Sequence, residues 1–308
     1  MTLKVWKQEL RLPFLILPLI FVLIGVSMAW KDGFLNPINA ILTIVGVLML
    51  HASVNVLNDY FDYKSGIDIA TTPTPFSGGS RILPEKLLTP NSVLSAGLLF
   101  LIIGSIIGIY LLSLFSFPII LITILILSIF SVIAYSSILA RFGLGELFIG
   151  LNFGPLLMVG TYMIQSGSFV LNATLIEPFL VGLIVGILTA GIVYINEFPD
   201  TLADKSKCRM HLVARMGKET ASKFFVYLIM SAYILVIIGV LVNILPIFTL
   251  ISLLLIPKMR GVFKILKANY DKINELIPAM GNNILATIWT GITLLIAYLA
   301  WGIILIGF

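Results

Sequence analysis

Apolar runs long enough to cross a lipid bilayer recur from one end of the chain to the other. A membrane-spanning helix needs about 20 consecutive apolar residues. Of the 308 residues, 59% are hydrophobic and only 11% are charged, whereas soluble domains carry about 25% charged residues. The composition therefore excludes a water-soluble globule and predicts an all-α, multi-pass transmembrane bundle.

The apolar runs divide into about nine predicted helices. Their ranges are 13–30, 38–58, 92–115, 118–139, 145–165, 175–197, 222–242, 245–266 and 284–307. Only Asn243 and Pro246 separate the seventh from the eighth, so a bundle of eight helices is an open alternative. We interpret residues 1–308 as one integral membrane domain, with a four-helix pseudo-repeat over 1–140 and 141–280 as a suggestion.

The basic residues predict how the helices are oriented. The chain has 19 Lys and Arg residues and a net charge of +5, and under this topology all of them except Lys31 lie on one side of the membrane. By the positive-inside rule, that side is the cytoplasmic side of a cell membrane. Because the orientation of the helices explains the positive charge, no nucleic-acid partner is expected. The amino terminus and the loops at 59–91, 140–144, 197–222 and 257–283 are predicted to be cytoplasmic.

Two acidic clusters, NDYFD at 58–62 and INEFPDTLAD at 195–204, stand at the ends of the second and sixth predicted helices. A spacing of four residues places Asn196, Asp200 and Asp204 on one helical face, and the same holds for Asn58 and Asp62. Both helices run toward the cytoplasm, so both clusters lie at the same depth. A helix carboxyl end is electrostatically unfavourable for acids, which indicates a need for cations. The alternative is that the acids only solvate the helix ends.

The residue types in these clusters predict a magnesium site. Hard divalent cations take oxygen ligands, and Mg²⁺ is often held between one or two carboxylates and substrate phosphates. A transition-metal site is less expected, because His51 and His211 lie outside the clusters and Cys208 is the only cysteine. The expected ligands are Asp59, Asp62, Asp200 and Asp204.

Local sequence signals add detail around the two clusters. Gly66 should break the four-residue pattern and place Asp68 in a turn that folds back, and Pro199 should kink or loosen the end of the sixth helix. In the loop PFSGGSR, Gly78 and Gly79 would let backbone N–H groups approach an oxyanion, and Arg81 could bind phosphate. Further candidates for neutralising a diphosphate are Arg141, Lys205 and Arg209.

The motifs N58-D59-Y-F-D62 and D200-T-L-A-D204 resemble those of the UbiA superfamily of intramembrane prenyltransferases. The stretches NDYFDYKSGID, PFSGGSRIL, GLGELFIGLNFGPLLMVGTY and NEFPDTLADK are similar to its MenA-type branch, the 1,4-dihydroxy-2-naphthoate prenyltransferases. The resemblance runs from about Arg11 to Gly217. Three features depart from it: Gly66 replaces a carboxylate, Pro199 replaces an Arg, and Cys208 and His211 interrupt a small, polar stretch.

The resemblance implies a Mg²⁺-dependent transfer of an isoprenyl group from an isoprenyl diphosphate to a lipophilic or aromatic acceptor within the membrane lipids. The acids of the two motifs, helped by Asn58, Asn196 and Asp68, would hold Mg²⁺, and Arg81, Arg141, Lys205 and Arg209 would stabilise the departing diphosphate. Tyr135 could stabilise an allylic cation. Two alternatives stay open: geranylgeranyl transfer to an ether-lipid glycerophosphate, and a cation-coupled transporter.

Overall fold

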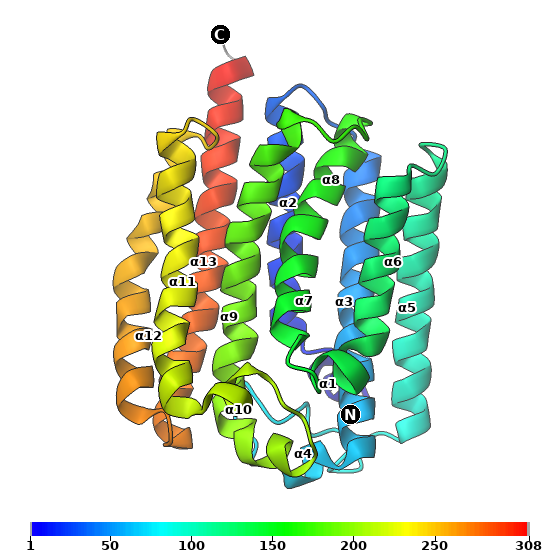
Figure 1. Cartoon of the computed structure of the whole chain (residues 1–308). Helices are drawn as coiled ribbons and strands as arrows, with labels where there is room; N and C mark the ends of the chain where they lie inside the picture. The colour runs from blue at the N-terminus through cyan, green and yellow to red at the C-terminus, as the bar shows by residue number, and fades with distance from the viewer. Residues whose placement is uncertain (1, 307–308) are drawn as a thin grey trace.

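Long α-helices standing side by side make up the protein (Figure 1). This computed structural model describes residues 2–306. Within that range, 8 helical segments are long and apolar enough to cross a membrane. They are Leu12–Lys31, Pro37–Ser65, Pro90–Ser113, Ile119–Leu139, Gly145–Ser166, Ala173–Ser206, Lys218–Leu241 and Ile273–Leu305.

The ninth predicted helix, at 245–266, is also present in a different form. It begins as a 3₁₀ helix over Ile247–Leu255 and continues as α12 over Ile256–Asn269. The prediction of an all-α, multi-pass bundle of about nine helices is therefore confirmed. The pseudo-repeat of 1–140 and 141–280 stays a prediction.

The segments that surround the acidic motifs are continuous or nearly continuous helices. They are α2 (Ile16–Lys31), α3 (Pro37–Ser65), α5 (Pro90–Ser113), α6 (Ile119–Ala134), α7 (Gly145–Leu151), α8 (Leu157–Ser166), α9 (Ile176–Ser206), α11 (Lys218–Leu241) and α13 (Ile273–Ile306). Three short helices complete the chain: α1 (Thr2–Glu9), α4 (Ile67–Ala70) and α10 (Leu212–Met216). In Figure 1, α4 and α10 lie together at one end of the bundle, which we call the site pole. We call the opposite end, where Lys31–Pro37 connects α2 to α3, the far pole.

Both acidic motifs lie on helices and not in the loops that follow them. The second predicted helix was placed at 38–58, but α3 extends to Ser65, where Gly66 in the left-handed region ends it. The sixth predicted helix was placed at 175–197, but α9 continues through Pro199 to Ser206, so the proline does not end the helix. Non-helical backbone instead occurs at Gly154, next to Pro155, between α7 and α8. The two motifs are thus held in regular backbone.

Candidate active site

A cavity of about 750 Å³ lies among the helices that carry the acidic motifs. Small-molecule sites usually measure about 300–1,000 Å³, so the cavity can hold a substrate. Its wall is polar toward the site pole, where Asp62, Asp68 and Asp204 lie. Further into the bundle the wall is apolar, with contributions that include Leu50, Val54, Leu111, Leu125, Phe153 and Leu157. One space therefore joins a charged end to a hydrocarbon-like chamber.

The last turns of α3 place Asn58 and Asp62 on the wall of the cavity. Asn58 Nδ2 donates hydrogen bonds to Asp62 Oδ2 at 2.9 Å and to Ser136 Oγ at 2.7 Å. The four-residue spacing between Asn58 and Asp62 therefore does what the sequence predicted, since the two side chains meet on one face. Asp62 is 6% exposed, so its carboxylate is oriented before any ligand arrives.

Asp59 lies behind that face and already has partners. It forms an ion pair with Arg11 and accepts a hydrogen bond from the Ser80 N–H at 3.0 Å. Ser80 Oγ in turn donates to Glu9 Oε2 at 2.8 Å. Burial and the charge of Asp59 raise the pKa of Glu9 to about 7. Asp59 is thus held by the amino-terminal segment and by the loop after α4.

Asp68, on α4, folds back to the cavity as the sequence predicted, and it is 3% exposed. A Cβ atom at Gly79 would lie 2.7 Å from Asp68 Oδ2, so only glycine lets this loop approach so closely. Arg81 donates to the carbonyl oxygen of Asp68 at 2.5 Å. Burial, together with the charges of Asp62 and Asp59, raises the pKa of Asp68 to about 8.

The second motif, on α9, presents oxygens that lack partners. Asn196, Asp200 and Asp204 all line the cavity. Within residues 2–306, the buried Oδ1 atom of each of the three has no hydrogen-bond partner. Buried polar atoms are normally satisfied, so each exception needs an explanation. Carboxylate and amide oxygens that point into a polar cavity fit a hard divalent cation such as Mg²⁺.

Arg209 joins the two motifs. Its guanidinium Nη1 lies 2.8 Å from Asp62 Oδ2 and 3.8 Å from Asp204 Oδ1. Burial opposes the charge, but these two carboxylates outweigh it and raise the pKa of Arg209. A permanently charged guanidinium therefore lies between α3 and α9, at the place where the sequence predicted an anionic ligand.

His211 corrects the expectation that both histidines lie outside the site. Its Nδ1 lies 3.1 Å from Glu197 Oε2 and its Nε2 lies 3.2 Å from Asp204 Oδ2. Burial favours the neutral ring, but Glu197 and Asp204 outweigh it and raise the pKa of His211 to about 9. Nδ1 also lies 3.2 Å from the Ala214 N–H, and it cannot accept from Ala214 while donating to Glu197. The raised pKa favours donation to Glu197.

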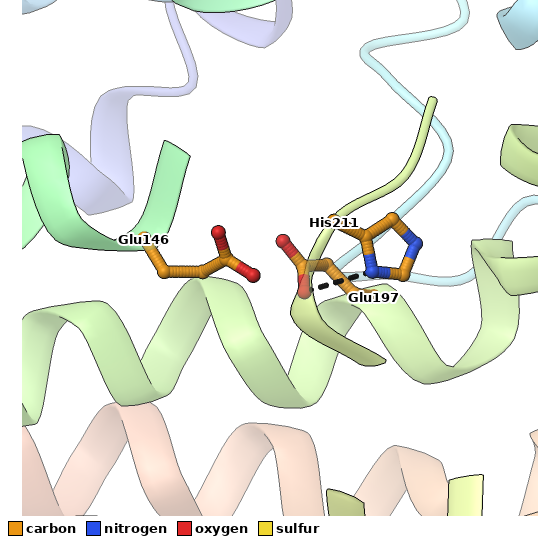
Figure 2. A group of neighbouring side chains, drawn as sticks. All are labelled: Glu146, Glu197 and His211. Atoms are coloured by element: carbon orange, nitrogen blue, oxygen red, sulfur yellow. Dashed lines mark ion pairs between the residues drawn. The ribbon is translucent and has the colours of Figure 1, made fainter. Parts of the chain in front are cut away.

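Glu146 completes a group with Glu197 and His211, and Figure 2 shows the two carboxyl groups facing each other. Glu146 comes from α7 and is 3% exposed. Its Oε1 accepts a hydrogen bond from the Leu212 N–H at 2.8 Å. This contact fixes the loop that carries His211 against α7.

The remaining predicted site residues divide into two groups. Tyr135 and Arg81 line the cavity beside the acids. Arg141 and Lys205 are exposed, and neither lines this cavity. Arg141 was predicted because it lies in a very short turn on the same face, and Lys205 because it directly follows Asp204. Lys205 instead lies exposed on the last turn of α9, and the loop after α9 brings Arg209 to the cavity.

Sequence reasoning missed four residues that the structure brings to the charged end: Arg11, Glu146, Glu197 and His211. Arg11 was counted only as a positive-inside charge. Glu197 lies inside the NEFPD motif, three residues before Asp200, so its proximity could have been inferred from helical spacing. Glu146 and His211 carried no such local signal, because they meet only through tertiary packing.

His51 lines the apolar part of the cavity, two turns before the acidic motif on α3. Its ring packs edge-on against Phe153, with 4.9 Å between the ring centroids. Its Nδ1 atom has no hydrogen-bond partner in the part of the chain that the structure describes. Nδ1 of His51 is therefore a polar atom in an otherwise apolar wall.

Comparison with known families agrees with this geometry. The profile of the UbiA prenyltransferase family matches residues 18–275. The chain is 24% identical over 238 residues to 1,4-dihydroxy-2-naphthoate octaprenyltransferase of Escherichia coli, covering 75% of this chain and 74% of that one. It is 26% identical over 262 residues to 2-carboxy-1,4-naphthoquinone phytyltransferase of Synechocystis, covering 83% of this chain and 80% of that one.

Solved structures show the same fold. A UbiA homologue from Archaeoglobus fulgidus, solved with GPP and Mg²⁺ bound, superposes with a TM-score of 0.58. The superposition covers 99% of this chain and 100% of that one, at 15% sequence identity. At this identity the likeness concerns the arrangement of helices.

Proposed function

The chain belongs to the UbiA prenyltransferase family, and from that premise we propose that it transfers an isoprenyl group from an isoprenyl diphosphate to an aromatic quinone precursor, with Mg²⁺ as cofactor. The protein is a multi-pass membrane prenyltransferase.

One observation carries the proposal. Two acidic motifs from distant parts of the chain meet at one end of a single cavity, and Arg209 contacts an acid of each. The other end of that cavity is apolar. A diphosphate with a hydrocarbon tail has the same division into a charged head and an apolar remainder.

The residues present fit a magnesium ion. Asp62, Asp200 and Asp204 line the cavity, and the buried Oδ1 atoms of Asp200 and Asp204 lack hydrogen-bond partners among residues 2–306. We propose that these three hold Mg²⁺ with Asp68, and that Asp59 joins them when Arg11 releases it. When bound, the ion would neutralise the diphosphate oxygens and so make the diphosphate a better leaving group.

Cationic side chains would bind the rest of the diphosphate. Arg209 lies between the motifs, and Arg11 and Arg81 also line the cavity. Asn58 and Asn196 present amide groups one helical turn before an acid of their motif, where they can orient that acid or donate to a phosphate oxygen. Preorganised charge of this kind usually supplies the largest part of catalysis.

The apolar chamber would hold the isoprenyl chain and keep water from the reacting carbon. In the reaction, the bond between the allylic carbon and the diphosphate oxygen breaks, and the oxygen keeps the electron pair. A carbon of the acceptor ring then donates an electron pair to the allylic carbon, and the ring loses a proton to restore aromaticity. Tyr135, on the cavity wall, can stabilise the allylic cation through its ring face.

We propose 1,4-dihydroxy-2-naphthoate as the representative acceptor. The supporting observation is that the two curated relatives above act, by name, on naphthoate or naphthoquinone compounds. Such a ring is electron-rich and flat, and an apolar chamber with few polar atoms suits it. We also propose that the site pole faces the cytoplasm, because nearly all Lys and Arg residues are predicted on that side.

A product assay tests the function. The purified protein is offered 1,4-dihydroxy-2-naphthoate, 4-hydroxybenzoate or geranylgeranylglyceryl phosphate, each with several isoprenyl diphosphates. We expect prenylated naphthoate to form only with Mg²⁺ present. Full activity in EDTA would contradict the metal assignment. A product formed only from geranylgeranylglyceryl phosphate would show that this compound, and not a naphthoate, is the acceptor.

A further inference from the structure

A second cluster of metal-ligating side chains lies beside the acidic motifs. We propose that Glu146, Glu197 and His211 together bind one transition-metal dication of the Zn²⁺ class, at a site distinct from the proposed magnesium site. The three come from α7, from α9 and from the residue before α10, and their ligand atoms all lie within 4.8 Å of one another (Figure 2).

The unused oxygen of Glu146 is the observation that points to a ligand. Glu146 is 3% exposed, and its Oε1 already accepts from the Leu212 N–H. Its Oε2 has no hydrogen-bond partner within the described residues. Figure 2 shows the carboxyl group turned toward that of Glu197. Two buried carboxylates that face each other repel unless a cation or a shared proton lies between them, and a dication would satisfy both.

The surroundings of His211 match those of a metal-bound imidazole. Ligating histidines almost always donate their second ring N–H to a carboxylate or carbonyl, which fixes the ring. Here Nδ1 lies on the side of Glu197, at 3.1 Å, and Nε2 lies 3.2 Å from Asp204 Oδ2. Nδ1 would bind an ion in place of a proton and of its contact with the Ala214 N–H. Nε2 would then keep its hydrogen, which can turn to Asp204 Oδ2 at 3.2 Å.

The set of donor atoms selects the kind of ion. Mg²⁺ prefers oxygen ligands and retains several waters, whereas a site with two carboxylates and one imidazole suits Zn²⁺. Bonds of about 2.0–2.1 Å in a tetrahedral site place the ligand atoms about 3.3 Å apart. The Glu197–His211 pair already meets this spacing, so the side chain of Glu146 need only swing inward, and its Oε2 loses no contact by doing so.

Three protein ligands leave one position of a tetrahedral ion open, which is the arrangement of catalytic zinc sites. Glu197 and His211 line the substrate cavity, whereas Glu146 lies behind them. The open position therefore faces the cavity, where it would take water or an oxygen of the acceptor. Binding of the ion does not depend on the proposed function, but this use of the open position rests on it.

The test measures metal binding directly. The full-length protein is purified in detergent, stripped with a chelator, loaded with Zn²⁺ in the presence of excess Mg²⁺, desalted and assayed for metal by mass spectrometry. We expect one Zn²⁺ per chain. Co²⁺ loaded in the same way should give the visible absorption bands of a tetrahedral ion with nitrogen and oxygen ligands.

Two isosteric variants locate the site. Glu146→Gln keeps an oxygen that can accept from the Leu212 N–H, and Glu197→Gln keeps the shape of the side chain. Each should weaken Zn²⁺ binding by at least about 10–100-fold, which is the typical cost of losing even a supporting group. The matched control is Asp62→Asn, which removes a proposed Mg²⁺ ligand and should retain the full Zn²⁺ content.

The outcomes separate this proposal from the proposed function. A wild-type protein that keeps no Zn²⁺ and shows no Co²⁺ bands, yet transfers prenyl groups with Mg²⁺, would overturn the second metal site alone. Retention of Zn²⁺ in both Glu→Gln variants at the wild-type level would also overturn it. Loss of transfer with Zn²⁺ binding intact would instead count against the proposed function.

Discussion

The two ends of the bundle use the same residue types in opposite ways. At the far pole, Lys31 lies 2.7 Å from Asp32 Oδ1 and 2.9 Å from Glu177 Oε2. Tyr162 donates to Asp32 at 2.8 Å and Tyr298 donates to Glu177 at 3.0 Å. Each acid there has a cation and a hydroxyl as partners, so the cluster is closed.

At the site pole, the acids outnumber their partners. Arg11 occupies Asp59, and Arg209 divides its contacts between Asp62 and Asp204. Asp200 Oδ1 has no hydrogen-bond partner in the described part of the chain. The difference teaches that acidic residues in a membrane protein do not by themselves identify a site. Unsatisfied oxygens on a cavity wall do, because they cost free energy until a ligand arrives.

The largest effect that follows from this comparison is on activity. Asp200→Asn should lower turnover by about 10²–10³-fold, the usual cost of removing one preorganised electrostatic group. Without Mg²⁺, the variant should be at least as stable as the wild type, because the change removes the charge of a partly buried carboxylate whose Oδ1 atom has no hydrogen-bond partner among the described residues. Single-turnover kinetics and thermal unfolding in detergent measure the two effects. A variant that loses stability and keeps its activity would show that Asp200 has a structural role, as the acids at the far pole do.

At the far pole, a second prediction expects a loss of stability without a loss of activity. Lys31→Met should lower the free energy of unfolding by about 2 kcal/mol, because it leaves the carboxylates of Asp32 and Glu177 without their cation. Turnover at a temperature where both proteins are folded should not change. In the double variant that also carries Glu177→Gln, the loss of stability should be smaller than the sum of the losses in the two single variants, because the two residues share one interaction. A loss of turnover in Lys31→Met alone would break the comparison.

Much of the fold could be predicted from the sequence because lipid imposes a simple rule. Backbone groups in a bilayer must be satisfied within each segment, so apolar runs such as 92–115 and 118–139 had to be helices. The boundaries near the acidic motifs were less predictable. The sixth helix was expected to end at residue 197, yet α9 continues through Pro199, because neighbouring helices can compensate for the missing backbone hydrogen bond.

The candidate site was predictable only where its residues share a helix. Asn58 with Asp62, and Asn196 with Asp200 and Asp204, follow from four-residue spacing. The contact of His211 with Glu197 and Asp204 joins a loop to α9, and the contact of Arg11 with Asp59 joins the amino-terminal segment to α3. Such contacts depend on tertiary packing, which residue spacing does not encode.

A third prediction concerns the effect of pH on Asp68 in the absence of Mg²⁺. The pKa of Asp68 is raised from 3.8 to about 8 in the folded protein, so the folded state binds a proton that the unfolded chain has released. The contribution of Asp68 to stability is therefore fully present below about pH 4 and is lost as the pH rises through about 8.

The test of this prediction compares two proteins in a chelating buffer. The free energy of unfolding of the wild type should fall more steeply between pH 5 and 8 than that of Asp68→Asn, with a difference in slope below about 1.4 kcal/mol per pH unit. Adding Mg²⁺ should flatten the wild-type curve if Asp68 contributes to the cation site. Equal slopes in the two proteins would show that Asp68 is not protonated at neutral pH.

The smallest expected effect distinguishes the poles through two glycines with similar backbone. Gly79 has φ +75° and a Cβ there would lie 2.7 Å from Asp68 Oδ2, whereas Gly33, at the far pole, has φ +86° and no atom within 4 Å of such a Cβ. Both Gly→Ala variants suffer the strain of left-handed backbone, about 1–2 kcal/mol. Gly79→Ala should lose about 1 kcal/mol more of the free energy of unfolding, because the added methyl displaces the Asp68 carboxylate.

Gly79→Ala should also raise the Mg²⁺ concentration needed for half-maximal activity, which Gly33→Ala should leave unchanged. If the two variants instead shift that concentration equally, the loop at 78–81 is a connection like the one at the far pole and not a part of the cation site.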